Sequence, residues 1–348
     1  GNTIMITGID RLKSAANGET TDRIPVFCNL LDQGARELGL SLKEYYSKGE
    51  YVAEGQLKMR EKYGYDNLWS LFYVGKEAEL LGCKNIIYSE FGPPNVGHMV
   101  ISKLEDIHKL EIPEDISSHP KFEETLKCLQ ILKKESDGKY PICAYLTASM
   151  TMPALLMGME KWIDLLLSGP YDLRDELLEK TSEFFRKQLI AYRDAGANVF
   201  LYSNPFGSLD FVPIKLFEEL SVPWMLKDLH SLDLQSVVYY CGGARLNPVI
   251  NSVIEKIGLT NFYLSPLDDL SEGKKIIAGR ALYAGVINDI KLVEWTKEEI
   301  RNEVRRIIDS SVDGKKFLFG TLVMPLAIPE ENIKAMLEAA YEFGRSEK

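Results

Sequence analysis

The stretch that decides the fold is Val237-Val238-Tyr239-Tyr240-Cys241-Gly242-Gly243. Its β-branched and aromatic residues predict a buried strand, and the two glycines that follow predict a turn. Apolar residues then recur at helical spacing over 246–257, so the strand leads into a helix. A strand that ends at Cys241 points this residue out of its carboxyl end, where barrel and doubly wound α/β folds bind ligands. A buried structural cysteine before an ordinary turn is the alternative interpretation.

The same alternation of short apolar runs and amphipathic segments repeats through the chain. We expect strands at 24–30, 65–72, 142–147, 198–202, 236–241, 261–265, 281–286 and 316–320, with helices at 160–168, 172–195, 213–229, 246–257 and 297–310. Eight strands are what a closed (β/α)8 barrel requires. We therefore predict an α/β fold with a single TIM-type barrel domain over 1–348. A helical segment at 3–17 precedes it, and a hairpin excursion at 85–102 interrupts it, where Pro93 and Pro94 disfavour a barrel strand.

Composition excludes several classes of partner. The chain has 348 residues and a formal net charge of −10, which argues against binding nucleic acid or an anionic membrane surface. Its five cysteines form no C-x-x-C pair, as is typical of a reducing compartment. No apolar run approaches the roughly 20 residues that a membrane-spanning helix needs. We expect a cytoplasmic enzyme.

The residues after the expected strands should meet at one mouth of the barrel. They are mostly neutral polar, acidic or aromatic: Asp32, Gln33, Tyr73, Ser149, Ser203, Asn204, Cys241, Asp268, Asp269, Asn288, Asp289 and Met324. Lys and Arg are scarce among them, so a phosphorylated or polyanionic substrate is not expected. Of the four histidines, only His98 follows a segment that could reach the mouth.

Several segments resemble, in order and spacing, the uroporphyrinogen decarboxylase superfamily, and within it the corrinoid-dependent methyltransferases. They are Asp22-Arg23-Ile24-Pro25-Val26, Gly39-Leu40-Ser41-Leu42-Lys43-Glu44-Tyr45, Tyr63-Gly64-Tyr65-Asp66, Glu77-Ala78-Glu79-Leu80-Leu81-Gly82, Ala195-Gly196-Ala197-Asn198, Cys241-Gly242 and Pro329-Glu330-Glu331-Asn332-Ile333. The resemblance implies a (β/α)8 barrel whose site lies at the carboxyl ends of the strands. It also implies that a separate corrinoid (cobalamin-type) protein is the partner. A homodimer would be consistent with the resemblance.

This chain departs from the decarboxylase pattern. The resemblance implies arginines after the first strand, which grip the substrate's carboxylates, and an aspartate after the second. Here the first segment reads Leu31-Asp32-Gln33-Gly34-Ala35-Arg36, and Tyr73 stands near the position of the aspartate. A tetracarboxylate would lack its counter-charges, so we do not expect uroporphyrinogen decarboxylation.

The chain also departs from the zinc pattern of the family. Methylcobamide:coenzyme M methyltransferases bind zinc through a His-x-Cys on this strand and a Cys near the last strand. Here Tyr239 replaces the His, and 320–325 contains no Cys, so Cys241 alone remains. Some O-demethylase relatives use Glu, Glu and His instead, and Glu77 and His98 match the spacing of the last two. The resemblance thus gives Glu77, His98 and Cys241 as candidate zinc ligands, unless Glu77 is a surface helix residue that matches by coincidence.

Our leading hypothesis is a methyltransferase that moves a methyl group between a small methylated compound, such as a methoxylated aromatic, and a corrinoid protein. The predicted catalytic residues are Tyr239, Cys241 and Asn288. The predicted substrate-binding residues are Asp32, Gln33, Tyr73, Ser149, Asn204 and Met324. Two alternatives remain open: a metal-free barrel that binds a ligand or the corrinoid protein without chemistry, and a thiol:corrinoid methyltransferase that uses Cys241.

Overall fold

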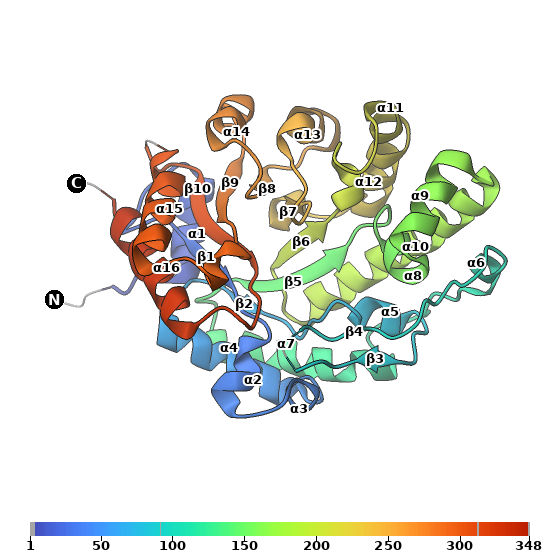
Figure 1. Cartoon of the computed structure of the whole chain (residues 1–348), viewed down its shortest axis with the longest axis horizontal. Helices are drawn as coiled ribbons and strands as arrows, with labels where there is room; N and C mark the ends of the chain where they lie inside the picture. Colours follow the sequence, from blue (N-terminus) through green and yellow to red (C-terminus); the bar gives the residue numbers. More distant parts are fainter. Residues whose placement is uncertain (1–3, 91, 312, 347–348) are drawn as a thin grey trace.

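The computed structural model describes residues 4–90, 92–311 and 313–346. Eight parallel strands form one sheet that curls into a nearly closed barrel with helices around it (Figure 1). Their order around the barrel is β1-β10-β9-β8-β7-β6-β5-β2. The strands are β1 Val26–Asn29, β2 Leu68–Trp69, β5 Ile142–Thr147, β6 Val199–Ser203, β7 Val237–Tyr240, β8 Asn261–Tyr263, β9 Leu282–Ile287 and β10 Phe317–Val323. The predicted (β/α)8 fold is confirmed.

Helices connect and cover the strands. The α-helices are α1 Gly8–Ala16, α2 Gln33–Leu38, α3 Leu42–Tyr45, α4 Gly49–Tyr63, α5 Lys76–Leu80, α6 Asp106–Lys109, α7 Glu123–Ser136, α8 Met152–Met157, α9 Met159–Ser168, α10 Tyr171–Ala195, α11 Ile214–Leu216, α12 Val222–Leu229, α13 Asn247–Ser252, α14 Leu270–Ile277, α15 Lys297–Asp309 and α16 Glu330–Phe343. Short 3-10 or π segments are η1 Pro120–Phe122, η2 Pro205–Gly207, η3 Phe217–Ser221, η4 Leu234–Ser236, η5 Val253–Ile257 and η6 Lys291–Val293. No helix of the described ranges is long and apolar enough to cross a membrane.

The expected hairpin excursion is present between β2 and β5. Ile86–Ile87 (β3) pairs antiparallel with Asn95–Val96 (β4), apart from the barrel sheet. The second barrel strand is shorter than the run at 65–72 predicts, because only Leu68 and Trp69 pair with β5. Farther along β5, the N–H of Thr147 donates to the carboxylate of Glu77 at 3.1 Å. A side chain thus accepts this backbone hydrogen bond on the side of β5 that faces β2.

The barrel closes between β1 and β2 through side chains as well as backbone. The N–H of Asp66 donates to the carbonyl of Val26, and the N–H of Cys28 donates to the Asn67 side chain, both at 2.9 Å. The buried Asp66 carboxylate also binds Arg11 at 2.9 Å and Arg23 at 2.7 Å. Because a buried carboxylate is costly unless it is paired, these partners explain why two of the segments that carry the family resemblance contain Arg23 and Asp66.

Strand residues alternate between an inner and an outer face. On β7, Val238 and Tyr240 belong to the cluster inside the barrel with Leu201 and Leu318. Val237, Tyr239 and Cys241 belong instead to the larger cluster between the strands and the helices. The core therefore has two layers, and the face that a strand residue occupies decides whether it can line the mouth.

Candidate active site

Four aromatic rings form a row across the inside of the barrel near the carboxyl ends of its strands. Phe72 lies 4.5 Å from Tyr145 between ring centroids, Tyr145 lies 5.8 Å from Tyr240, and Tyr240 lies 5.7 Å from Tyr263. We call these four residues the aromatic floor. Two hydroxyls are held in place, since that of Tyr145 lies 2.7 Å from Oγ of Ser203 and that of Tyr263 donates to the carbonyl of Thr321. Tyr145 keeps part of its surface exposed, whereas Phe72, Tyr240 and Tyr263 are buried, so Tyr145 is the ring of the floor that a ligand can contact directly.

Tyr239 and Cys241, predicted to be catalytic, lie on the outer face of β7. The Tyr239 hydroxyl donates to the carbonyl of Gly207 at 2.7 Å, and its ring packs against Tyr202 and Phe262. A Cβ atom at Gly207 would lie 2.3 Å from that hydroxyl, so only glycine fits there. The Cys241 thiol is 1% exposed, and burial raises its pKa well above the ordinary value. A thiol in this state is a poor nucleophile, because the thiolate is the reactive form.

The side chain of Asn288, the third predicted catalytic residue, takes part in a local turn. Its oxygen accepts a hydrogen bond from the N–H of Lys291 at 3.3 Å. Its neighbour Asp289 is partly buried, and burial raises the pKa of its carboxyl. Burial is the main reason why the pKa of the Tyr240 phenol is raised, and charges that include Asp289 contribute less. Asp289 therefore holds its proton to higher pH than a solvated aspartate would.

The predicted substrate-binding residues Asp32 and Tyr73 lie at one corner of the mouth. The Tyr46 hydroxyl donates to Asp32 at 2.5 Å, and burial raises the pKa of Asp32. The Tyr46 and Tyr73 rings are 5.2 Å apart, and the Tyr73 hydroxyl donates to Glu79 at 3.0 Å. The structure thus brings Asp32 and Tyr73 together through Tyr46.

The other predicted substrate-binding residues hold the scaffold together. Gln33 donates to the carbonyl of Met324 at 2.8 Å, and Sδ of Met324 packs 3.4 Å from Sγ of Cys28. Asn204 accepts from the Thr151 hydroxyl at 2.9 Å, while its buried Nδ2 has no partner among the described residues. Ser149 donates to Asp228 at 2.9 Å and has no exposed surface. These contacts involve backbone and core atoms, so they position the loops of the mouth.

The candidate zinc ligands are not assembled. Glu77 is 1% exposed, so it is not a surface residue, but both carboxylate oxygens accept from Thr147, the shorter contact being 2.6 Å. His98 is exposed, and its Nδ1 lies 4.0 Å from Sγ of Cys83. Across 4–90, 92–311 and 313–346, no three His, Cys, Asp or Glu side chains cluster in a way that could hold a metal. The residues present do not fit the zinc site that the resemblance implies.

The segments that follow the eight strands are acidic or neutral. Residues 30–35, 70–75, 148–152, 204–209, 241–244, 264–269, 288–290 and 324–328 contain four aspartates and neither Lys nor Arg. Lys76, directly beyond the second segment, is paired with Glu79 at 3.2 Å. Arg36, beyond the first, donates to the carbonyl of Leu326. Arg245, directly beyond the fifth segment, is paired with Asp210 at 2.7 Å. Within the described residues, Lys291, directly beyond the seventh segment, is the one such flanking cation without a salt bridge or a hydrogen bond from its side chain, whereas a polycarboxylate would require several free cations.

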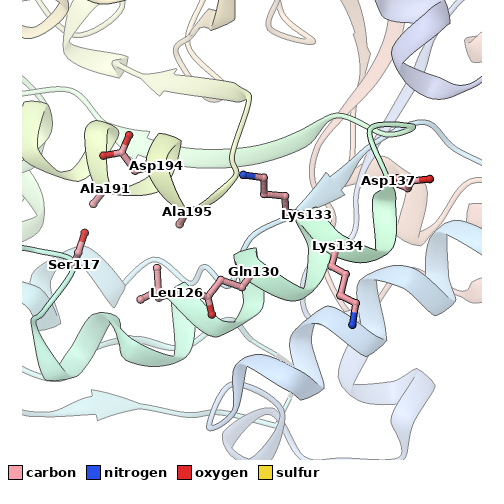
Figure 2. Close-up of a pocket in the computed structure, with 9 residues that line it drawn as sticks. All are labelled: Ser117, Leu126, Gln130, Lys133, Lys134, Asp137, Ala191, Asp194 and Ala195. Carbon is pink, nitrogen blue, oxygen red and sulfur yellow. The ribbon is translucent and has the colours of Figure 1, made fainter.

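A groove elsewhere on the surface does not contribute to this site. Figure 2 shows it between α7 and α10, lined by residues such as Gln130, Lys133 and Asp194, with a volume of about 610 Å³. Its lining comes from the outer helices and the loops beside them. Because no residue after a barrel strand reaches it, we do not place the chemistry there.

The comparisons with known proteins agree with the fold. The family model for uroporphyrinogen decarboxylase matches residues 7–343. The chain belongs to the uroporphyrinogen decarboxylase family. Its relatives in this family carry two kinds of activity. A methylcobamide:CoM methyltransferase from Methanosarcina barkeri is 23% identical over 96% of this chain and 97% of its own. A uroporphyrinogen decarboxylase from Trichlorobacter lovleyi is also 23% identical, over 97% of this chain and 99% of its own.

A solved methyltransferase from Methanosarcina mazei has the same fold. Its TM-score is 0.84 at 21% identity, and the match covers 97% of this chain and 99% of that one. Membership of the uroporphyrinogen decarboxylase family thus rests on nearly the whole chain, and the chain is similar to methylcobamide:CoM methyltransferases and to uroporphyrinogen decarboxylases alike. The mouth of the barrel has to distinguish the two activities within the family.

Proposed function

We propose that this member of the family moves a methyl group between a small, uncharged or weakly charged methylated compound and a corrinoid carried by a separate protein. The observation that carries the proposal is the chemistry of the mouth. An aromatic floor is bordered by segments with four aspartates and no cation. Aromatic rings bind a compact organic donor through apolar contact and their ring faces, whereas the four carboxylates of uroporphyrinogen need arginines or lysines.

The same reasoning bears on the acceptor. Coenzyme M, named for the methanogen relative, is a thiol with a sulfonate group, and next to the strand-end segments the described residues offer a sulfonate one cation without a salt bridge, Lys291. Cys241 is buried and protonated, so we do not route the reaction through it. The corrinoid of the partner supplies the cobalt centre that exchanges the methyl group.

The residues of this chain have two roles in the proposed reaction. The aromatic floor orients the donor, and such positioning supplies a large share of the rate enhancement in reactions between two bound partners. Asp289 provides a proton. When the donor is a methyl ether, the methyl–oxygen bond breaks, the oxygen keeps the electron pair and takes the Asp289 proton, and the methyl group leaves toward the partner. General acid catalysis of this kind contributes about 10²- to 10⁴-fold.

The test is a panel of donors labelled with ¹³C in the methyl group, incubated with the purified protein and free cob(I)alamin. The panel contains a methoxylated phenol, dimethyl sulfide and tetramethylammonium, and mass spectrometry detects labelled methylcobalamin. We expect label from at least one donor and no CO2 release from uroporphyrinogen III. Carbon dioxide release without methyl transfer would reinstate the decarboxylase. Donor binding without either reaction would favour the non-catalytic barrel.

A further inference from the structure

A second cavity opens at the amino-terminal end of the barrel and extends up to Tyr263 of the aromatic floor. Its volume is about 610 Å³, within the range of about 300 to 1,000 Å³ that is usual for small-molecule sites. We call it the amino-end cavity, because its rim is made of residues directly before five strands, among them Asn198, Gln235, Thr260, Arg280 and Lys316. The proposed methyl transfer does not use this region.

The short helix α1 borders the cavity. Its nine residues extend about 13 Å. The N–H of Ile9 donates to the carbonyl of Lys139 at 2.9 Å, which fixes the helix beside the start of β5. Leu12 and Ala16 of α1 line one wall of the cavity. Phe27 of β1 and residues in or just before β6 to β10, up to Tyr263, form most of the rest of the lining.

The interior of the cavity is apolar. Val199, Leu201, Val238, Leu282 and Leu318 line it, and all are on the inner face of the barrel. Val238 remains partly exposed in the cavity wall. Burying such a surface under an alkyl chain is favourable by about 25 cal/mol per Å². The interior therefore suits an unbranched hydrocarbon tail.

The rim is cationic, although the whole chain carries a net charge of −10. Lys13, Arg280 and Lys316 line it, against one acidic residue, Asp233. The Asp233 carboxylate is occupied by the N–H of Gln235 at 3.1 Å. Three cations beside one occupied carboxylate form a local positive patch that suits an anionic head group.

Two of these cations lie at the same end of α1. Lys13 is in the last turn of the helix. Lys316 packs beside the residues that follow it, since a Cβ atom at Gly18 would lie 3.6 Å from Cε of Lys316. Arg280 has other partners, with a salt bridge to Glu255 at 3.8 Å. Neither Lys13 nor Lys316 forms a salt bridge within the described residues, although Nζ of Lys316 donates to the carbonyl of Gly279 at 3.0 Å. Without a competing carboxylate, these two lysines are the better pair to hold an anion.

We propose that the amino-end cavity binds an amphiphilic carboxylate, with its alkyl tail inside the barrel and its head group between Lys13 and Lys316. The ligand class follows from an apolar interior joined to a cationic rim. This cavity opens at the other end of the barrel from the mouth and shares only Tyr263 with the aromatic floor. Its occupation does not depend on the proposed methyl transfer.

The test compares three ligands with the same ten-carbon tail, titrated into the full-length protein by calorimetry. Decanoate is expected to bind at one site per chain. Decanol and decyltrimethylammonium are expected to bind at least about tenfold more weakly, a difference of about 1.4 kcal/mol. Equal affinity for decanol, or no binding of decanoate, would overturn the proposal.

Two variants test whether the ligand binds in the amino-end cavity. The double variant Lys13→Glu/Lys316→Glu should weaken decanoate binding at least about tenfold, whereas Lys43→Glu/Lys215→Glu, with the same charge change on exposed lysines elsewhere, should not. Ala16→Trp, at an exposed α1 position in the cavity wall, should block binding without disturbing the barrel core. Thermal melts check that each variant is folded. Decanoate binding that survives both Lys13→Glu/Lys316→Glu and Ala16→Trp would contradict the assignment.

Discussion

Tyr239 and Tyr240 are consecutive residues whose side chains lie on opposite faces of β7. The Tyr240 ring contacts Tyr145 and Tyr263 inside the barrel, with centroids 5.8 and 5.7 Å away. The Tyr239 hydroxyl donates to Gly207 in the layer between strands and helices. The two tyrosines therefore have separate roles, and substitutions can tell them apart.

Truncation of Tyr240 should impair methyl transfer as well as lower the stability of the fold, because Tyr240 is buried. Tyr240→Ala removes one of the two central rings of the aromatic floor and two edge-on aromatic contacts, each worth about 0.5 to 1.5 kcal/mol. We expect kcat/KM to fall about 10- to 100-fold, since each 1.4 kcal/mol is a factor of ten. Steady-state kinetics with the preferred donor measure the effect. Val238→Ala, on the same face toward the other end of the barrel, is the matched control and should leave kcat/KM within about twofold.

Removing the Tyr239 hydroxyl should cost stability and leave catalysis intact. Tyr239→Phe leaves the buried carbonyl of Gly207 without its partner, which costs about 1 to 3 kcal/mol. The midpoint of urea unfolding should therefore drop while kcat/KM stays near wild type. A large loss of activity without destabilisation would restore Tyr239 as a catalytic residue, as the sequence alone suggests.

Asp289 should matter only for donors whose leaving atom needs a proton. Asp289→Asn is expected to slow transfer from a methyl ether about 10²- to 10⁴-fold, and to leave transfer from tetramethylammonium little changed, because trimethylamine departs without a proton. For the ether, activity of the wild-type protein should decline as pH rises through the raised pKa of Asp289. Asn288→Ala is the neighbouring control. Equal loss for both donors would show that Asp289 acts in some other way than as an acid.

Glu77 should make the folded state less stable as pH rises. Burial raises the pKa of Glu77 to about 7, from an ordinary value near 4.5, although its hydrogen bonds with Thr147 oppose the shift. Because the folded pKa is the higher one, its contribution is fully favourable below about pH 4.5 and is lost progressively up to pH 7, by at most about 3 kcal/mol. Glu77→Gln cannot titrate, so its stability relative to wild type should increase between pH 5 and pH 8.

Urea unfolding of the two proteins at both pH values measures this difference. Asp228, whose pKa burial raises to about 6, titrates in both proteins and cancels in the comparison. A stability difference that is the same at pH 5 and pH 8 would mean that Glu77 ionises in the folded protein as it does in water.

Metal analysis tests the ligand set that the family resemblance suggests. Glu77, His98 and Cys241 do not come together with other ligands in the described residues. We therefore expect well under one zinc per chain by elemental analysis, with no change in Glu77→Ala, His98→Ala or Cys241→Ser. About one zinc per chain that is lost with Cys241→Ser would instead support thiol activation.

The barrel was predictable because its strands are strongly patterned. The runs at 142–147 and 281–286 correspond closely to β5 and β9, since long buried strands between amphipathic helices leave a clear periodicity. The run at 65–72 overestimates β2, because the Glu77 side chain, distant in sequence from β5, takes the place of backbone pairing. Such a tertiary substitution leaves no local signal.

The position of the candidate site stays a prediction that follows from the fold, because strand ends indicate the mouth. Asp32 and Tyr73 lie near each other there, on either side of Tyr46. The end of β7 points to Cys241, and the family's zinc motif points to Tyr239 and Cys241, whereas the alternation along β7 places Tyr240 inside the barrel. Tyr240, Tyr145 and Tyr263 all point to the inner face of the barrel. This shared direction could have revealed the role of Tyr240, but it can be recognised only once the pairing of the strands is known.

The most direct measurement follows the loss of cob(I)alamin absorbance on mixing with protein and a methylated donor, in wild type and Tyr240→Ala side by side. The proposed function predicts rapid loss with wild type and a rate about 10- to 100-fold lower with the variant. No loss with any donor, or the same rate in both proteins, would contradict methyl transfer at the aromatic floor.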